Sequence, residues 1–284
     1  MRNIAVIDDT FDIELASTYH LSIQYCSRNF SFVIRDASGT NFIAYKSHWF
    51  DKPVQKQEMA DQIRGFLNAD SFLTRSYKSV QFLYQTPVSV LVPSALFRKE
   101  NPEAYFRFSA DLLEEEKVHY RKIPSIDAFV LFPMPEDLIN QVSFMLDKVQ
   151  FFHQACPQIE AAMAETSGSA DSSQVFAHIN PGSADLLVVK QNKLILYNSF
   201  VIKNTEDLVF FILYLYEQFG LSQEETALNL SGFLERYPGA IELLNQYLKQ
   251  AEISKFPKEY SFSNCFSDIV QHHLVSIINL SRCE

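Results

Sequence analysis

The sequence predicts an α/β fold made of two similar halves, and three observations lead to this expectation. Apolar residues alternate with polar ones at the start of each half, a helical repeat follows, and the order strand–strand–strand–helix–strand occurs twice. Matching elements lie about 154 residues apart, as Leu21 and Val175 or Phe30 and Ala184 do. Because residue identity between the halves is negligible, the repeat is one of pattern, and it suggests an internal duplication.

The first half opens with period-two alternation, in which short polar turns separate the apolar runs. A helix is expected next, because Met59, Ile63 and Leu67 recur at helical spacing. The expected elements are an edge strand at 4–7, a meander at 20–26, 30–34 and 42–46, a helix through 59–67, and strands at 80–84 and 88–92.

The middle of the chain is less regular. We expect a helix at 110–116 and extended segments at 118–123 and 127–132. Pro135 suits the first turn of a further helix. The apolar stripe predicted for that helix steps by four and three through Leu138, Val142, Met145, Val149 and Phe152.

The second half follows a small, polar stretch at 165–174, which is typical of a flexible loop or linker. Asn204 or Thr205 is expected to cap its first helix, and Gly220 to end it. The expected elements are strands at 175–179, 185–190 and 193–202, that helix, a strand at 227–230, a helix opened by Pro238, and a last helix at 268–280. This organisation predicts a first lobe at 1–160, a linker at 161–174 and a second lobe at 175–284.

Composition limits the class of protein. Of 284 residues, 47% are hydrophobic and 20% charged, so the chain can bury a sizeable core. The formal net charge of -10 disfavours binding of nucleic acid phosphates. Four cysteines lie far apart without a Cys-x-x-Cys pair, and no apolar run approaches the ~20 residues that span a bilayer. We therefore expect a cytoplasmic protein with no transmembrane segment and no nucleic acid partner.

The element order, given twice, resembles the ribonuclease-H-like lobes of the actin-like ATPase superfamily. The layout is similar to that of the pilus-assembly and cell-division actin homologues of bacteria, and the whole chain resembles a bacterial family of uncharacterised proteins with a degenerate form of this fold. The resemblance implies an ATP cleft between the lobes, where one hairpin turn from each lobe surrounds the phosphates and carboxylates hold Mg²⁺ through water. It also implies a Gly-Gly turn late in the second lobe for the adenosine.

The sequence departs from that pattern at each hairpin. The first turn reads Cys26-Ser27-Arg28-Asn29 and has neither an acid nor a glycine. In the second turn, His178 occupies the position where an Asp is expected, and Asn180 occupies the position where a Gly is expected. The remnants that the resemblance assigns to a nucleotide cleft are Gly182, Ser183, Asp185 and, in the reduced adenosine turn, Gly232.

Two functions from different classes follow. The first is a non-catalytic, actin-like protein that binds a partner protein or itself, with no catalytic residue, no metal and no cofactor, although weak ATP and Mg²⁺ binding stays open. The second is a divergent ATPase or sugar-kinase-like enzyme that uses Gly182 and Asp185 at an unusual phosphate-binding hairpin. A cleft filled by Phe, Tyr or Arg28 would favour the first, and an open cleft lined by carboxylates the second.

Other groups of residues give weaker indications of a functional site. Residues 4–10 resemble the first strand of a phosphoacceptor receiver domain, but a meander follows where helix and parallel strand should alternate. His272 and His273 diverge by about 100° on a helix and do not form one metal face. The 25 Phe and 13 Tyr are expected mainly in the core, and a partner surface is the alternative.

Overall fold

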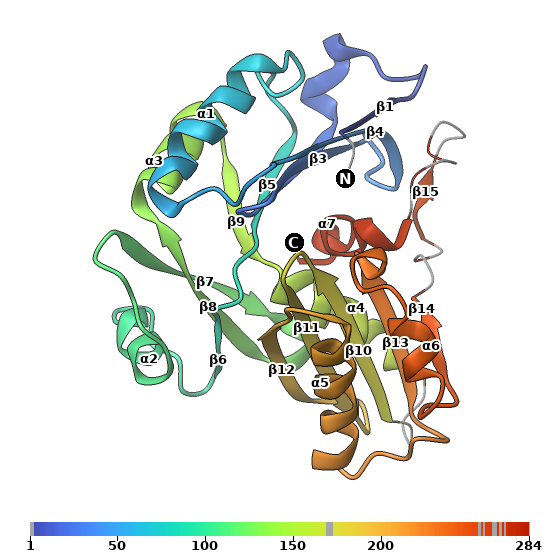
Figure 1. Cartoon of the computed structure of the whole chain (residues 1–284). Helices are drawn as coiled ribbons and strands as arrows, with labels where there is room; N and C mark the ends of the chain where they lie inside the picture. The colour runs from blue at the N-terminus through green and yellow to red at the C-terminus, as the bar shows by residue number, and fades with distance from the viewer. Residues whose placement is uncertain are drawn as a thin grey trace.

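The computed structural model describes residues 3–168, 173–254, 257, 259–262, 266, 269 and 271–283. Three sheets organise this part of the chain (Figure 1). The first has the order β1-β4-β3-β2-β5-β9, with β15 also paired to β4. Its strands are β1 (Ile4–Ile7), β2 (His20–Tyr25), β3 (Asn29–Arg35), β4 (Asn41–Trp49), β5 (Ser79–Tyr84), β9 (Val149–His153) and β15 (Ser261–Phe262).

The second sheet has the order β12-β11-β10-β13-β14. Its strands are β10 (Ser173–Asn180), β11 (Ser183–Lys190), β12 (Lys193–Val201), β13 (Ala227–Gly232) and β14 (Ala251–Ile253). It repeats the order and directions of β4-β3-β2-β5-β9, because in both sheets an antiparallel meander is followed by two parallel strands. The expected order of elements is therefore confirmed in both halves.

A small third sheet interrupts the first half between β5 and the next large helix. Its order is β6-β8-β7, with the strands β6 (Val90–Pro93), β7 (Glu116–Ile123) and β8 (Ala128–Pro135). The helix α2 (Pro102–Ser109) packs on it through Phe106, which is fully buried in one core with Leu131 and the buried Phe97. The second sheet has no such insertion, because only a 3₁₀ turn (Leu234–Arg236) and one short α-helix, α6 (Ala240–Leu244), lie between β13 and β14.

Helices cover both faces of the two large sheets. On the first sheet, α1 (Met59–Ala69) and α3 (Glu136–Met145) lie side by side on one face (Figure 1). On the second, α5 (Thr205–Gln218) and α6 pack against one face in a common core. The spacing of Ile63, Leu67, Leu138 and Val142, all fully buried, explains why α1 and α3 face this core.

The other two helices each pack on the sheet of the opposite half. The helix α4 (Ala155–Thr166), which follows the last strand of the first sheet, packs on β11 and β12 of the second. The helix α7 (Val275–Ile278) packs on β2 and β3 of the first sheet and lies between the two sheets in Figure 1. Ile277 and Ile278 share their core with Val33 and Tyr45, so each half completes the other's core.

Three predicted helices differ from the structure. Residues 110–116 are not a helix: Asn101 caps α2 by accepting from the Ala104 N–H, and Ala110 is already extended. The stripe that we assigned to one helix through Phe152 is divided, because α3 ends at Met145 and β9 begins at Val149. The chain reverses between them through Lys148, which has φ +56°.

The last predicted helix is broken into three pieces. A 3₁₀ helix at Gln271–Leu274 precedes α7, and another at Asn279–Cys283 follows it. Residues 267, 268 and 270, which fall in or beside the predicted helix, lie outside the described residues. Of the predicted linker, 169–172 also lie outside them, while α4 extends to Thr166 and β10 begins at Ser173. The division into 1–160, 161–174 and 175–284 stays a prediction.

Candidate functional site

The two hairpin turns that the sequence singled out meet at one cavity. The turn between β2 and β3 is closed by the Cys26 N–H donating to the Asn29 carbonyl, and the turn between β10 and β11 pairs Asn180 with Ser183. The cavity between them, here called the hairpin cavity, has a volume of about 200 Å³. It is lined by Cys26, Ser27, Arg28, Gln85, Thr86, Pro87, Gln154, Asn180, Pro181, Gly182, Ser183 and Val201.

Arg28 is the charged side chain of this cavity, and none of the described residues that line it is an aspartate or glutamate. Its other polar groups are amides and hydroxyls, several of them already bonded. The Gln154 amide donates to the Thr86 carbonyl at 2.7 Å, and the Gln85 amide donates to Asn180 Oδ1 at 3.4 Å. The Cys26 thiol is held protonated, because burial raises its pKa.

Gly182 and Ser183 are the two predicted remnants that line the hairpin cavity. Gly182 has φ +93°, a conformation that favours glycine, and a Cβ there would meet no atom within 4 Å. Its carbonyl accepts from the Ile202 N–H at 3.0 Å, which joins the turn to the end of β12. Backbone geometry therefore explains this glycine without a ligand.

Asp185 is fully buried, and it is not among the residues that line the hairpin cavity. Its carboxylate accepts three hydrogen bonds: from Asn180 Nδ2 at 2.8 Å, from Gln158 Nε2 at 3.0 Å and from Ser199 Oγ at 2.5 Å. The carboxylate thus joins both ends of the turn to β12 and α4. A buried carboxylate needs such donors, because without them its desolvation would be costly.

Gly232, the fourth predicted residue, lies at the end of β13 against β10. It has φ +84°, and a Cβ there would lie 2.1 Å from the Ile179 carbonyl oxygen. His272 Nδ1 lies 2.8 Å from the Gly232 carbonyl oxygen, so that oxygen is already occupied. The two halves also touch here, since Phe233 packs edge-on against Trp49 of β4 with ring centroids 4.9 Å apart.

A buried polar network continues from Asp185 into the interface between the halves. Gln158 of α4 donates to Asp185 and, at 3.2 Å, to Ser276 of α7. The Ser276 hydroxyl lies 3.2 Å from His178 Nε2, and His178 Nδ1 lies 2.9 Å from the Ser231 hydroxyl. Five elements, α4, α7, β10, β11 and β13, are therefore joined through fully or almost fully buried side chains.

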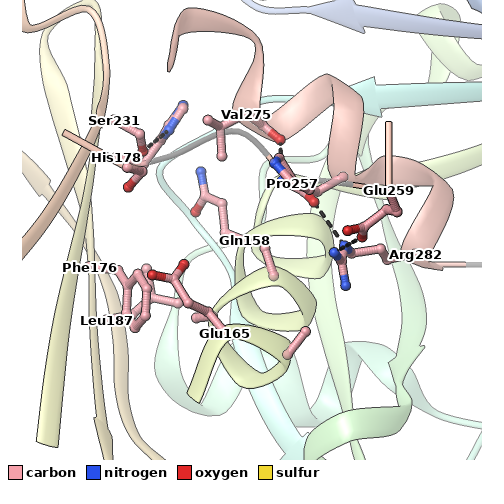
Figure 2. Close-up of a pocket in the computed structure, with 15 residues that line it drawn as sticks. Gln158, Glu165, Phe176, His178, Leu187, Ser231, Pro257, Glu259, Val275 and Arg282 are labelled. Atoms are coloured by element: carbon pink, nitrogen blue, oxygen red, sulfur yellow. Dashed lines mark hydrogen bonds and ion pairs between the residues drawn. The ribbon is translucent and has the colours of Figure 1, made fainter. Parts of the chain in front are cut away.

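This network borders a second cavity of about 410 Å³, here called the helix cavity (Figure 2). Gln158 and Glu165 enter it from α4, His178 and Ser231 bond to each other on its opposite wall, and Glu259 pairs with Arg282 at its far side. Burial lowers the pKa of His178 to about 3, with smaller contributions from His273 and His272, so His178 is neutral at pH 7. A neutral ring serves here as a hydrogen-bonding group of the core.

Sequence reasoning missed Gln158, Ser276 and Ser231, and it placed His178 only as a substitute for an acid. No short-range signal marks them, because they come from α4, α7, β13 and β10 and meet only in the folded chain. His272 and His273 do not share a metal: one faces the Gly232 carbonyl and the other Glu235. Among the described residues, no group of three or more His, Cys, Asp or Glu lies together as metal ligands would.

Comparison with known proteins places the chain in a family. The model of a family described as "Protein of unknown function (DUF3822)" matches residues 8–251. Among curated proteins, none matches the chain. In the described part of the chain, every helix is too short or too polar to cross a bilayer.

Three solved structures share the fold. One is a protein of Bacteroides thetaiotaomicron with an actin-like ATPase fold and unknown function; it is 22% identical with a TM-score of 0.79, over 97% of this chain and 100% of that chain. The PilM-PilN type IV pilus biogenesis complex contributes a chain that is 11% identical with a TM-score of 0.61, over 93% and 97%. The ethanolamine utilization protein EutJ from Carboxydothermus hydrogenoformans is 10% identical with a TM-score of 0.50, over 94% and 90%.

These findings confirm the expected actin-like ATPase fold and the expected resemblance to a family without an assigned role. At such identities the likeness shows the fold alone. Whether the chain contacts a nucleotide through Gly182, Ser183, Asp185 or Gly232 stays a prediction.

Proposed function

The chain belongs to the DUF3822 family of proteins of unknown function and has an actin-like ATPase fold, and on this premise we propose that it is a non-catalytic member of that fold which acts by binding another protein or a further copy of itself. One observation carries the proposal. The hairpin cavity lies between the two turns that the resemblance assigns to the nucleotide phosphates, and it has no carboxylate among its described lining residues. Mg²⁺ takes oxygen ligands, commonly carboxylates, so this cavity does not fit Mg²⁺–ATP.

Size and surroundings support the same proposal. A volume of about 200 Å³ is below the ~300–1,000 Å³ of typical small-molecule pockets. Asp185, the nearest acid of the hairpin, already accepts three hydrogen bonds inside the core. Where an adenosine turn is expected, Phe233 packs against Trp49, and the Arg236 guanidinium lies 5.3 Å from the Trp49 ring centroid.

Exposed aromatic side chains support a protein partner. Phe108 on α2 is 92% exposed, Phe144 on α3 is 88% exposed and Phe210 on α5 is 60% exposed. Large aromatic side chains left on a surface are enriched in protein interfaces. A structural neighbour described as part of the PilM-PilN complex is consistent with this role. A cytoplasmic location and an origin by duplication belong to the same proposal.

The test is nucleotide binding and turnover by the purified full chain. We expect no ATP hydrolysis above background with Mg²⁺ and no rise in melting temperature. The control is Ser183→Trp, which fills the hairpin cavity. Mg²⁺-dependent hydrolysis that co-elutes with the purified chain would contradict the proposal, and its loss in the Ser183→Trp variant would assign it to the hairpin cavity.

A second candidate is a divergent nucleotide-dependent enzyme. It is favoured by Gly182, whose open φ +93° turn presents backbone beside Ser183 in the hairpin cavity. If this candidate is right, ATP raises the melting temperature of the wild-type chain and Ser183→Trp removes the rise. A rise with ATP but no turnover would identify a nucleotide-binding protein without catalysis.

A further inference from the structure

The helix cavity combines apolar walls with one polar wall. The apolar walls come from alanines of α4, from Phe176 of β10 and from Val275 of α7 (Figure 2). The polar wall consists of His178 and Ser231, which are only 3% and 6% exposed. Its volume of about 410 Å³ lies within the ~300–1,000 Å³ of typical small-molecule pockets, which the hairpin cavity does not reach.

Asp185 fixes the direction of the hydrogen bonds that lead to the polar wall. A carboxylate oxygen only accepts, so Gln158 turns its Nε2 toward Asp185, and its Oε1 accepts from the Tyr197 hydroxyl at 3.1 Å. The second proton on Nε2 is donated to the Ser276 hydroxyl oxygen at 3.2 Å. Ser276 therefore accepts from Gln158 and keeps its own proton to donate.

The Ser276 proton in turn fixes the tautomer of His178. Ser276 is fully buried, and among the described residues the acceptor within reach of its hydroxyl proton is His178 Nε2, at 3.2 Å. A buried hydroxyl proton without an acceptor is costly, so Nε2 accepts this proton. Because burial lowers the pKa of His178 to about 3, the ring is neutral at pH 7 and carries its single proton on Nδ1. Nδ1 donates it to the Ser231 hydroxyl oxygen at 2.9 Å.

This chain of donors leaves the Ser231 hydroxyl with a proton of its own to give. Its oxygen accepts from His178, and within the described part of the chain no further hydrogen bond reaches it. Because Ser231 is buried and lines the helix cavity, an acceptor for this proton has room inside that cavity. A molecule that brings an acceptor to the polar wall therefore gains a hydrogen bond that the chain alone does not make.

The surroundings of Ser231 select a neutral acceptor. Gln158 donates both Nε2 protons within the core and His178 donates its one proton to Ser231, so the Ser231 hydroxyl is the remaining donor of this wall. A carboxylate or phosphate placed here would bury a charge against a single donor, which is unfavourable. Arg282, the basic side chain among the described lining residues, is already paired with Glu259 at the far side (Figure 2).

We propose that the helix cavity binds a small, neutral, largely apolar molecule that carries a carbonyl oxygen or an aromatic ring nitrogen, which accepts the hydroxyl proton of Ser231. The apolar body of the molecule lies against the α4 alanines, Phe176 and Val275. Such a ligand contacts α4, α7 and the second sheet at once. The site is separate from the hairpin cavity, and the inference does not rest on the proposed function.

The experiment compares two probes of the same shape in ligand-observed NMR titrations of the purified full chain. Acetophenone carries a carbonyl oxygen, and in α-methylstyrene a CH₂ group replaces that oxygen. We expect saturable binding of acetophenone and about fivefold weaker binding of α-methylstyrene, because only the ketone accepts from Ser231.

Three substitutions locate the site. Ser231→Ala removes the donor, so acetophenone should bind no more tightly than α-methylstyrene. Ser183→Ala is the matched control, because it removes a serine hydroxyl that lines the hairpin cavity instead, and it should leave both affinities unchanged. Ala161→Phe fills the helix cavity without removing a hydrogen bond and should abolish binding of both probes.

Four results would overturn the inference: equal affinity of the wild-type chain for the two probes, no binding of either probe, a preference for the ketone that survives in Ser231→Ala, or binding that survives in Ala161→Phe. If Ser231→Ala fails to fold, the wild-type comparison and Ala161→Phe still decide. ATP takes no part in these titrations, so their outcome is independent of the test of the proposed function.

Discussion

Each large sheet contains a ladder of paired residues between two parallel strands, β2 with β5 in the first and β10 with β13 in the second. The two ladders end differently. Six residue pairs join β2 to β5, and six join β10 to β13. The last pair is Tyr25 with Tyr84 in the first sheet, and Ile179 with Gly232 in the second. Both tyrosines are buried, and the Tyr25 hydroxyl donates to Gln62 Oε1 at 2.9 Å.

The same backbone hydrogen bond closes both ladders. The Gln85 N–H donates to the Tyr25 carbonyl at 2.9 Å, and the Phe233 N–H donates to the Ile179 carbonyl at 2.8 Å. The ladders differ in the residue before this donor, because Tyr84 fills space with a buried side chain, whereas Gly232 has φ +84° and leaves no room for a Cβ. The same closing bond forms with either residue, so the glycines of this fold do not by themselves indicate a nucleotide.

The largest effect is expected at the end of the second ladder. Gly232→Ala places a Cβ 2.1 Å from the Ile179 carbonyl oxygen at a positive φ, so the backbones of β10 and β13 must move apart. We expect a loss of about 4 kcal/mol or more in the free energy of unfolding, or failure to fold. Urea titration measures it. The control is Gly182→Ala, where the Cβ meets no atom and only backbone strain of about 1–3 kcal/mol remains.

The second largest loss of stability is expected at Asp185 of β11, and the equivalent position on β3, Ser31, provides the comparison. Asp185 faces His178 in the second sheet as Ser31 faces Gln24 in the first. Asp185→Ala removes the acceptor of Asn180 Nδ2 and of the Ser199 hydroxyl and one of the two acceptors of Gln158 Nε2, which should cost about 3 kcal/mol. Ser31→Ala should cost about 1 kcal/mol. Equal losses for the two substitutions in urea titrations would contradict this assignment.

Acid should destabilise both halves through buried histidines. Burial lowers the pKa of His178 to about 3 and that of His153, on β9, to about 4, whereas an unfolded histidine titrates near 6.5. Between these pH values the unfolded chain binds more protons, so stability falls as the pH falls from 6.5. Each histidine should contribute about 1.4 kcal/mol per pH unit in that range. His178→Gln should make the pH dependence of unfolding shallower, and an unchanged slope from pH 7 to 5 would exclude this origin.

The smallest effect is expected at Gln24, the first-sheet counterpart of His178. Gln24 is buried, and among the described residues its side-chain oxygen has no hydrogen-bond partner. Gln24→Met removes this unsatisfied acceptor at similar volume and should stabilise the chain by about 1 kcal/mol. His178→Met, which breaks two hydrogen bonds, should destabilise it in the same thermal melts. Loss of stability in both variants would contradict the prediction that Gln24, unlike His178, is an unfavourable buried polar group.

Much of the fold could be predicted because its signals are local. The meanders are encoded within a few residues, and so is the start of α5, where of the two expected caps Asn204 is the one observed. The strand β9 was missed because its apolar residues continue the helical stripe of α3. Lys148 makes the intervening turn at φ +56°, and a lysine there gives no sequence signal for such a conformation.

The candidate site was less predictable, for a physical reason. The resemblance led to Gly182 and Ser183, which line the hairpin cavity. The partners of Asp185 could not be found in the same way, because Gln158 lies on a helix that crosses from the first half to the second sheet. Hydrogen bonds between distant elements follow from packing, which a period of two or 3.6 does not reveal.

The exchange of α4 and α7 between the sheets has a consequence for biosynthesis. During translation, the face of β2 and β3 that α7 covers stays bare until residues beyond 274 have left the ribosome, long after the strands themselves have emerged. Over that interval the nascent polypeptide exposes Val33 and Tyr45, and transiently exposed hydrophobic surface of this kind is what chaperones protect from aggregation. The core on this face of the first sheet can therefore form only after α7 has been synthesised.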